Sequence, residues 1–146
     1  MADAEFKVEG LDDLLKKLDR LPENLEKNVL RGAIRASATP IVKDAKARVP
    51  VLQTPDARRV AGALRRSIHA RSVQMKNGRL TGGVTAGGSD KSAGKKDTYY
   101  ARFVEFGTAK MQARPFLRPA IDHQTGAATE AFGTYIRDRL KEFIYL

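Results

Sequence analysis

The 146-residue sequence contains no cysteine and only two histidines, and it has no long apolar run. Without cysteine, disulfide bonds and thiolate metal sites are excluded. Neither His69 nor His123 has a second potential ligand at the spacing of a metal site, so no metal site is predicted. No segment approaches the roughly 20 apolar residues of a membrane helix, and the N-terminus lacks an apolar signal segment. The sequence therefore predicts a protein made in the cytoplasm, with no membrane partner.

Patterns typical of catalysis are also missing. The glycine-rich residues 87–97 superficially resemble a phosphate-binding loop, but Gly88 and Gly94 are separated by five residues, and Lys95 is followed by Lys96. A phosphate-binding loop needs four residues between its glycines, then lysine followed by serine or threonine. The sequence has no nucleophile-elbow motif either. We therefore expect no enzymatic activity, no catalytic residue and no cofactor.

The charge of the chain is unbalanced, with a formal net charge of +10. Residues 43–79 contain ten basic and two acidic residues and thus hold most of the excess. Such a segment favours either a polyanion or an acidic protein surface as its partner. The candidate contact residues are Arg58, Arg59, Arg65, Arg66 and Arg71. Both kinds of partner remain open at this point, and a small basic nucleic-acid-binding protein is the alternative function.

Apolar spacing predicts two helices in the first third of the chain, after a short strand over residues 5–8. The first helix covers residues 11–21. The second covers residues 23–48, and a kink or break is expected before its internal proline, Pro40. We expect its stripe of Leu25, Val29, Ala33 and Ile41 to pack on a following hairpin.

The hairpin is expected to consist of strands over residues 64–73 and 79–86, joined by Asn77-Gly78, a strong turn signal. Gly82 and Gly83 are expected to mark a bulge. A flexible loop at 87–97 and a short helix at 99–106 ended by Gly107 should follow. Pro115 should open a last helix with an apolar stripe of Ile121, Ala128, Phe132, Ile136, Leu140 and Phe143. The predicted fold class is α+β, with long N-terminal helices and a C-terminal helix packed on a small antiparallel sheet.

One acidic residue stands inside an aromatic segment. Glu105 lies between Val104 and Phe106, and a half-buried carboxylate needs hydrogen-bond donors or a cation. Arg114 and Arg118 are the expected partners. The ion pair would either tie the segment to the last helix or mark a contact with another subunit. The neighbouring aromatic residues are expected to be core more than a base-stacking surface. They are Tyr99, Tyr100, Phe103, Phe106 and Phe116.

Two segments of the sequence resemble the signature of a phage family. Residues 99–108 (YYARFVEFGT) and 114–120 (RPFLRPA) are similar to the "YA.FVEFGT … RPFLRPA" pattern of the tail-completion, or head–tail joining, proteins of long-tailed bacteriophages and prophages. Residues 6–14, 45–51 and 62–68 resemble other blocks of that family, in the same order. The motif residues carried over as structural or interface residues are Tyr99, Tyr100, Phe103, Glu105, Phe106, Gly107, Arg114, Pro115, Phe116, Arg118 and Pro119.

The resemblance implies a single tail-completion-like domain over residues 1–146. An inserted loop at 52–61 separates two family blocks that normally follow each other closely, and such insertions cost little closure entropy. The resemblance further implies a structural virion protein of the neck or proximal tail. It would join head to tail as a subunit of a ring, with six-fold symmetry favoured. Its partners would be other copies of itself, the head-connector protein, a tail-terminator or tail-tube protein, and, in passing, phage DNA.

Overall fold

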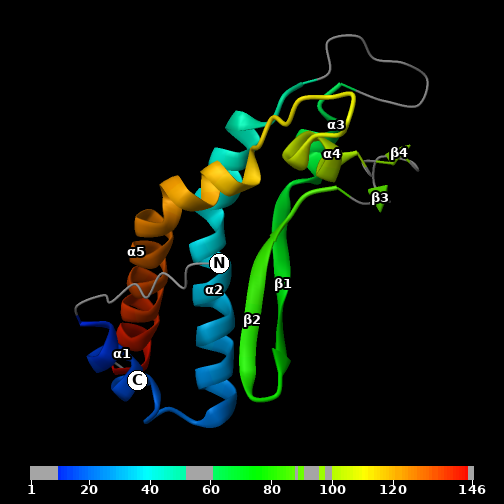
Figure 1. Ribbon diagram of the computed structural model, residues 1–146. Helices are drawn as coiled ribbons and strands as arrows, with labels where there is room; N and C mark the ends of the chain where they lie inside the picture. Colours follow the sequence, from blue (N-terminus) through cyan, green and yellow to red (C-terminus); the bar gives the residue numbers. More distant parts are fainter. Residues whose placement is uncertain (1–9, 52–60, 88, 91–95, 98–99, 145–146) are drawn as a thin grey trace.

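The computed structural model describes residues 10–51, 61–87, 89–90, 96–97 and 100–144 (Figure 1). The helices and strands of this part follow the order α1 (Leu11–Leu18), α2 (Glu23–Arg48), α3 (Ala63–Ser67), β1 (His69–Lys76), β2 (Arg79–Thr85), β3 (Ser89–Asp90), β4 (Lys96–Asp97), α4 (Ala101–Phe106) and α5 (Leu117–Ile144). The α+β class is confirmed. Within the described residues, no helix is both long and apolar enough to cross a membrane.

The central element is α2, which contacts α5 on one side and the β1–β2 hairpin on another. Figure 1 shows the three as neighbouring columns, with α1 against the C-terminal half of α5. Acidic Asp12 and Asp13 lie in the first turn of α1, and basic Lys16 and Lys17 lie in its last turn. This arrangement of charges complements the helix dipole. The long helices thus form a scaffold to which the shorter elements are attached.

Two apolar clusters hold the scaffold together. The first, which we call the lower cluster, joins α1, α2 and α5 through Leu18, Val29, Ala33, Ile136 and Leu140. The second, which we call the upper cluster, joins the last turns of α2 to α3, α4 and the start of α5. Its buried members are Ala45, Val49, Leu64, Ile68, Ala101, Phe116 and Ala120. The upper cluster is the one that positions α4.

The composition of the lower cluster corrects the predicted packing of α2. Val29 and Ala33 pack against α5 and not against the hairpin, while Leu25 is 37% exposed. The hairpin instead meets another face of α2, where a Cβ added to Gly82 would lie 2.4 Å from Ile34 Cγ2. Gly82 therefore allows β2 to approach α2 closely. The predicted stripe of α5 is also wrong at one position, since Ile121 is 47% exposed.

The β1–β2 hairpin confirms the predicted turn. Lys76 pairs with Arg79, and Asn77 and Gly78 have φ values of 51° and 74°. Positive φ at both central residues is the requirement of a type I′ turn. The register shifts between Arg71 and Gln74, so that two residues of β1 oppose Gly82. The predicted irregularity is therefore present, but the extra residue is on β1.

Two local predictions were wrong. Residues 63–67 form α3 and not the beginning of a strand, which starts only at His69. The buried residues Leu64 and Ile68 are four apart, a spacing that suits a helical turn as well as a strand face. The second correction concerns Pro40: the break considered before it is absent, because Pro40 lies inside one continuous α2.

Several predictions fall on residues that the structure does not describe, among them the strand at 5–8 and all but residue 61 of the inserted loop at 52–61. Of the predicted loop at 87–97, Ser89–Asp90 and Lys96–Asp97 pair as two short antiparallel strands. Residue 87 is described as well, and the rest of that loop lies outside the described residues.

Candidate interaction site at the start of α5

The carboxylate of Glu105 on α4 binds the first turn of α5. Its Oε2 accepts hydrogen bonds from the backbone N–H groups of Phe116 at 2.7 Å and Leu117 at 3.0 Å, and its Oε1 accepts one from Arg118 at 3.0 Å. Glu105 is buried, with 8% of its surface exposed. A helix begins with N–H groups that have no partner inside the helix, and its N-terminus favours negative charge. Glu105 supplies acceptors for these groups from α4, the helix that precedes α5.

The sequence around these amides explains why one side chain suffices. Pro115 and Pro119 have no N–H, so the only backbone donors between them are those of residues 116, 117 and 118. Glu105 binds all three. Proline is well accommodated in the first turn of a helix, where its missing donor is not needed. The two prolines and Glu105 therefore complete the helix start together.

Gly107 fixes the chain after α4. Its φ of 74° and ψ of 176° are open essentially to glycine alone, and a Cβ there would lie 2.8 Å from the backbone nitrogen of Ala113. The Arg114 N–H then donates to the Val104 carbonyl at 2.8 Å, and Thr108 and Met111 pair across a tight turn. The segment from α4 to α5 is thus held at both ends.

The predicted arginine partners of Glu105 were wrong. Within the described residues, no ion pair joins Glu105 to Arg114 or Arg118, and both arginines are exposed. Backbone amides bind the carboxylate in place of the expected guanidinium groups, and a pattern of side chains does not predict backbone donors. The intramolecular role considered for Glu105 is present in this structure, because the carboxylate ties the aromatic segment to the last helix.

The aromatic residues divide into two groups. Phe116 is fully buried and Tyr100 is half-buried against the upper cluster. Phe106, by contrast, is 78% exposed and Phe103 is 41% exposed, so the expectation that these aromatics are core is wrong for both. Tyr99 lies outside the described residues. Of the remaining motif residues, Pro115 is exposed and Pro119 is half-buried.

The predicted basic contact residues lie at the surface where they are described. Arg65 and Arg66 are exposed on α3, and Arg71 is exposed on β1. Arg66 Nη1 donates to the Ala61 carbonyl at 3.5 Å. Arg58 and Arg59 fall outside the described residues. The three described arginines therefore remain accessible to an anionic partner.

A polar link between α2 and α5 was missed by the sequence analysis. Asp44 accepts hydrogen bonds from Arg48 Nε at 2.6 Å and from Gln124 Nε2 at 3.0 Å, and its side chain is 13% exposed. These donors, Arg48 first, hold the pKa of Asp44 below its ordinary value despite the opposing effect of desolvation. The spacing of Asp44 and Arg48 suggests a pair within α2, but nothing local indicates Gln124, 80 residues away.

The comparison with protein families gives one match to this chain. Residues 12–107 match the model of the HK97-gp10-like family, described as "Bacteriophage HK97-gp10, putative tail-component". The chain belongs to this family. The matched range runs from α1 through Gly107 and so includes Glu105 and its helix, whereas α5 lies beyond it. No curated protein and no solved structure matches the chain.

Membership in the HK97-gp10-like family indicates a structural role in the phage tail, and with it a place in the virion. The described residues include no group of three or more His, Asp or Glu side chains that could hold a metal ion. The contact of Glu105 with the first turn of α5 joins α4 to the last helix.

Proposed function

We propose that this tail component is a neck subunit that joins the phage head to the tail as part of a closed ring, with six copies favoured over twelve. Family membership supports the tail role, and the sequence resemblance to tail-completion proteins supports the position. The structural observation that supports the proposal is the exposed surface of α4. Its aromatic surface is exposed while its base is locked to α5 by Glu105. A rigid, exposed apolar surface is typical of a protein–protein contact.

The experiment is a mass measurement combined with localisation. Native mass spectrometry is performed on the purified protein alone and after addition of an extract that contains finished tails. We expect an assembly with the mass of a closed ring in the presence of tails, because a ring contact can depend on a template. An antibody against the protein should label the junction of head and tail in intact particles. Labelling of the capsid interior or of the distal tail tip would refute the proposal.

Nucleic-acid binding is a second candidate function, and the exposed basic residues favour it. Arg65, Arg66 and Arg71 make no ion pair within the described part of the chain. Lys76 and Arg79 face each other across the hairpin and are exposed as well. Phosphate contacts release counterions, so binding to duplex DNA would weaken steeply with salt. This candidate function would be excluded if the dissociation constant for duplex DNA stayed the same between about 50 and about 200 mM salt.

A further inference from the structure

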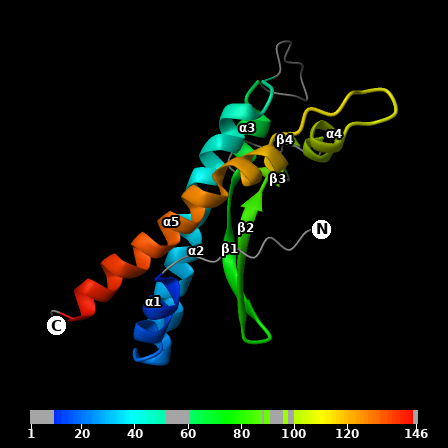
Figure 2. The same ribbon diagram turned by 60° about the vertical axis from the view of Figure 1, so that its left-hand side comes forward.

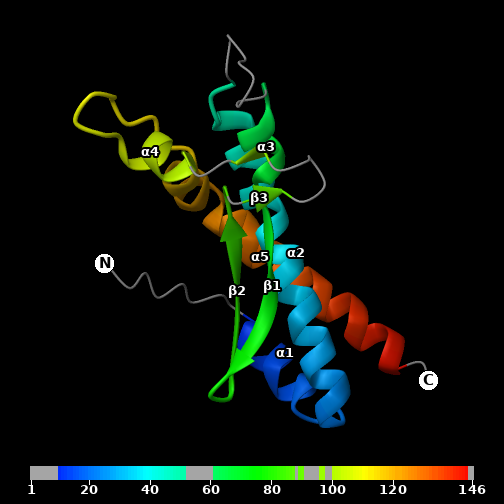
Figure 3. The same ribbon diagram turned by 90° about the vertical axis from the view of Figure 1, so that its right-hand side faces the viewer.

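The tip of the segment that follows α4 carries unusual apolar exposure. Phe106 is 78% exposed and Met111, in the next turn, is 43% exposed. Figures 2 and 3 show α4 and the turn after it projecting from the body formed by α2, α5 and the hairpin. We call Phe106 and Met111 the knob. Large aromatic side chains at such positions are the residues that most often dominate the energetics of interfaces.

The residues on both sides of Phe106 are fixed by contacts, and exposed basic residues are near the knob in the sequence. Glu105 precedes Phe106 and is bound to three amides of α5, and Gly107 follows it in a conformation that only glycine adopts easily. A surface that is ordered before binding loses less entropy on association. Arg102, Lys110 and Arg114 near the knob are exposed, and none makes an ion pair within the described residues.

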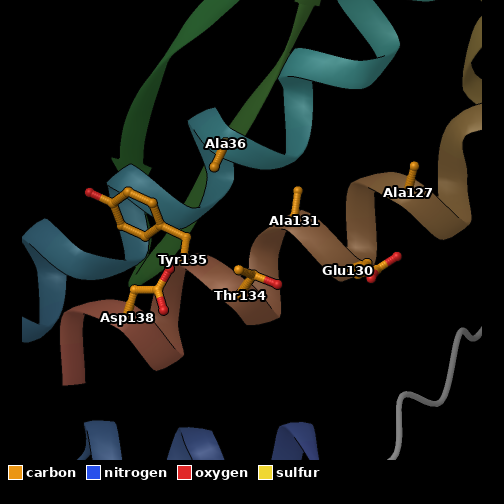
Figure 4. Close-up of a pocket in the computed structure, with 7 residues that line it drawn as sticks. All are labelled: Ala36, Ala127, Glu130, Ala131, Thr134, Tyr135 and Asp138. Carbon is orange, nitrogen blue, oxygen red and sulfur yellow. The ribbon is translucent and has the colours of Figure 1, made fainter. Parts of the chain in front are cut away.

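A groove of complementary character lies elsewhere on the chain. It is a shallow, open hollow of about 450 Å³ that runs along α5 and is bordered on the α2 side by Ala36. Figure 4 shows Ala36 on α2 and Ala131 on α5 pointing into the space between the two helices, with Tyr135 toward one end. The carboxylates of Glu130 and Asp138 lie at its edge.

The rim of the groove carries the carboxylates of Glu130 and Asp138, and the guanidinium of Arg139 lies over the Tyr135 ring at one end, 5.4 Å from its centroid. Glu130 makes no ion pair among the described residues, and Asp138 has only an exposed neighbour, Lys141, with Nζ 3.8 Å from Oδ1. An exposed pair of this kind is worth little and can be exchanged for a better one. Apolar centres with oppositely charged rims are what a specific contact requires, because the charges fix the register and reject wrong partners.

We propose that the occupant of the groove is the knob of a second copy of this chain, and that this contact connects neighbouring subunits. The inference rests on the proposed function, since the ring supplies the neighbouring copy. Knob and groove belong to different parts of the surface, so the contact is heterologous. Each subunit then offers a knob to one neighbour and a groove to the other. Contacts of this kind close into a ring when the rotation between subunits allows it.

The test uses the absence of cysteine from the chain. Two cysteines are introduced at the rims, Lys110→Cys beside the knob and Glu130→Cys at the groove, which leaves Phe106 and the alanines in place. Particles assembled from a phage that encodes only this variant are treated with a bismaleimide cross-linker and separated under denaturing conditions. We expect a ladder of covalent oligomers that ends at the number of subunits in the ring. A matched control combines Lys110→Cys with Asp13→Cys on the exposed surface of α1 and should give monomer.

The possible outcomes separate the contact from the function. Particles that contain the protein but yield only monomer from the Lys110–Glu130 pair would overturn the contact and leave the proposed function standing. A covalent dimer from Lys110→Cys alone would show a knob-to-knob contact and also overturn it. Particles that lack the protein altogether would overturn the proposed function, and the contact with it.

A second pair of variants tests the energetics. Phe106→Ser should reduce incorporation into particles by at least about tenfold, as expected for a central interface aromatic. The control Ile121→Ser alters an exposed apolar residue of α5 outside the groove and should leave incorporation unchanged. Glu130→Lys should lower incorporation, and adding Lys110→Glu should restore it in part. Equal losses from Phe106→Ser and Ile121→Ser would contradict the contact.

Discussion

Removing the carboxylate of Glu105 should destabilise the whole upper half of the molecule. The change Glu105→Ala leaves three backbone N–H groups at the start of α5 without their acceptor, and two of the donors, those of Phe116 and Leu117, share one oxygen. Loss of a single helix cap costs about 0.5–2 kcal/mol, and a hydrogen bond to a charged group contributes about 1.5–3 kcal/mol. The three bonds are not additive, because water can reach part of the exposed amides. We expect about 2–4 kcal/mol for Glu105→Ala.

The conservative variant Glu105→Gln separates charge from shape. It keeps one acceptor oxygen but places an amide NH₂ near backbone donors, so we expect an intermediate loss of about 1–2 kcal/mol. Urea denaturation measures both losses. A loss of 3 kcal/mol corresponds to a fall in Tm of roughly 6–12 °C for a chain of this size. Glu130→Ala removes an exposed carboxylate from the same helix and serves as the control, with a change within about 0.5 kcal/mol.

Hydrogen exchange of individual backbone amides measures the effect of Glu105→Ala at the start of α5. The amides of Phe116, Leu117 and Arg118 should exchange faster in Glu105→Ala, while those in the middle of α5 keep their relative protection. The reasoning would be refuted if Glu105→Ala unfolded at the same urea concentration as the parent, or if these three amides were no faster in the variant.

Three further predictions concern the scaffold. Gly107→Ala should lower the free energy of unfolding by about 1–3 kcal/mol in urea denaturation, because it forces a Cβ against Ala113. Gly126→Ala, in open space on α5, should raise it by about 0.5–1 kcal/mol. Equal effects of the two changes would contradict the close contact at Gly107. Val29→Asp should cost at least about 3 kcal/mol, while Leu25→Asp should cost far less; similar melting temperatures for the two would contradict the packing of α2 on α5. Because the pKa of Asp44 is lowered in the folded state, its contribution is complete above the unfolded pKa of about 4 and is lost as the pH falls through the lower folded value. The stability difference between the parent and Asp44→Asn should therefore shrink below about pH 4, and a difference that grows on acidification would contradict the linkage.

The sequence predicted the elements whose signals are local. The bounds of α2, the Asn77-Gly78 turn and the end of α4 at Gly107 each depend on residues next to one another in the chain. What it could not supply was the partner of each apolar face. α2 is apolar on more than one side, so Val29 and Ala33 could equally have faced a sheet or a helix. Only the position of α5, whose Ile136 comes 103 residues after Ala33, decides between them.

The candidate site, too, could be predicted only in part from the sequence. That Glu105 needed partners was evident from its apolar neighbours, but their identity was misjudged because arginine is the usual partner of a buried carboxylate. A usable signal was present in the two prolines of residues 115–119, which leave three adjacent N–H groups at a helix start. The exposure of Phe106 had no such signal. An aromatic residue in a helical pattern is most often core, and a binding surface uses the same residue type.

The most direct test of the central claim is electron microscopy of particles made by a phage that lacks this gene. A subunit that joins head to tail is not needed to fill the head or to build the tail. We therefore expect filled heads and finished tails that remain separate, and joined, infectious particles when the protein is supplied from a plasmid. Normal infectious particles in the absence of the protein would contradict the account.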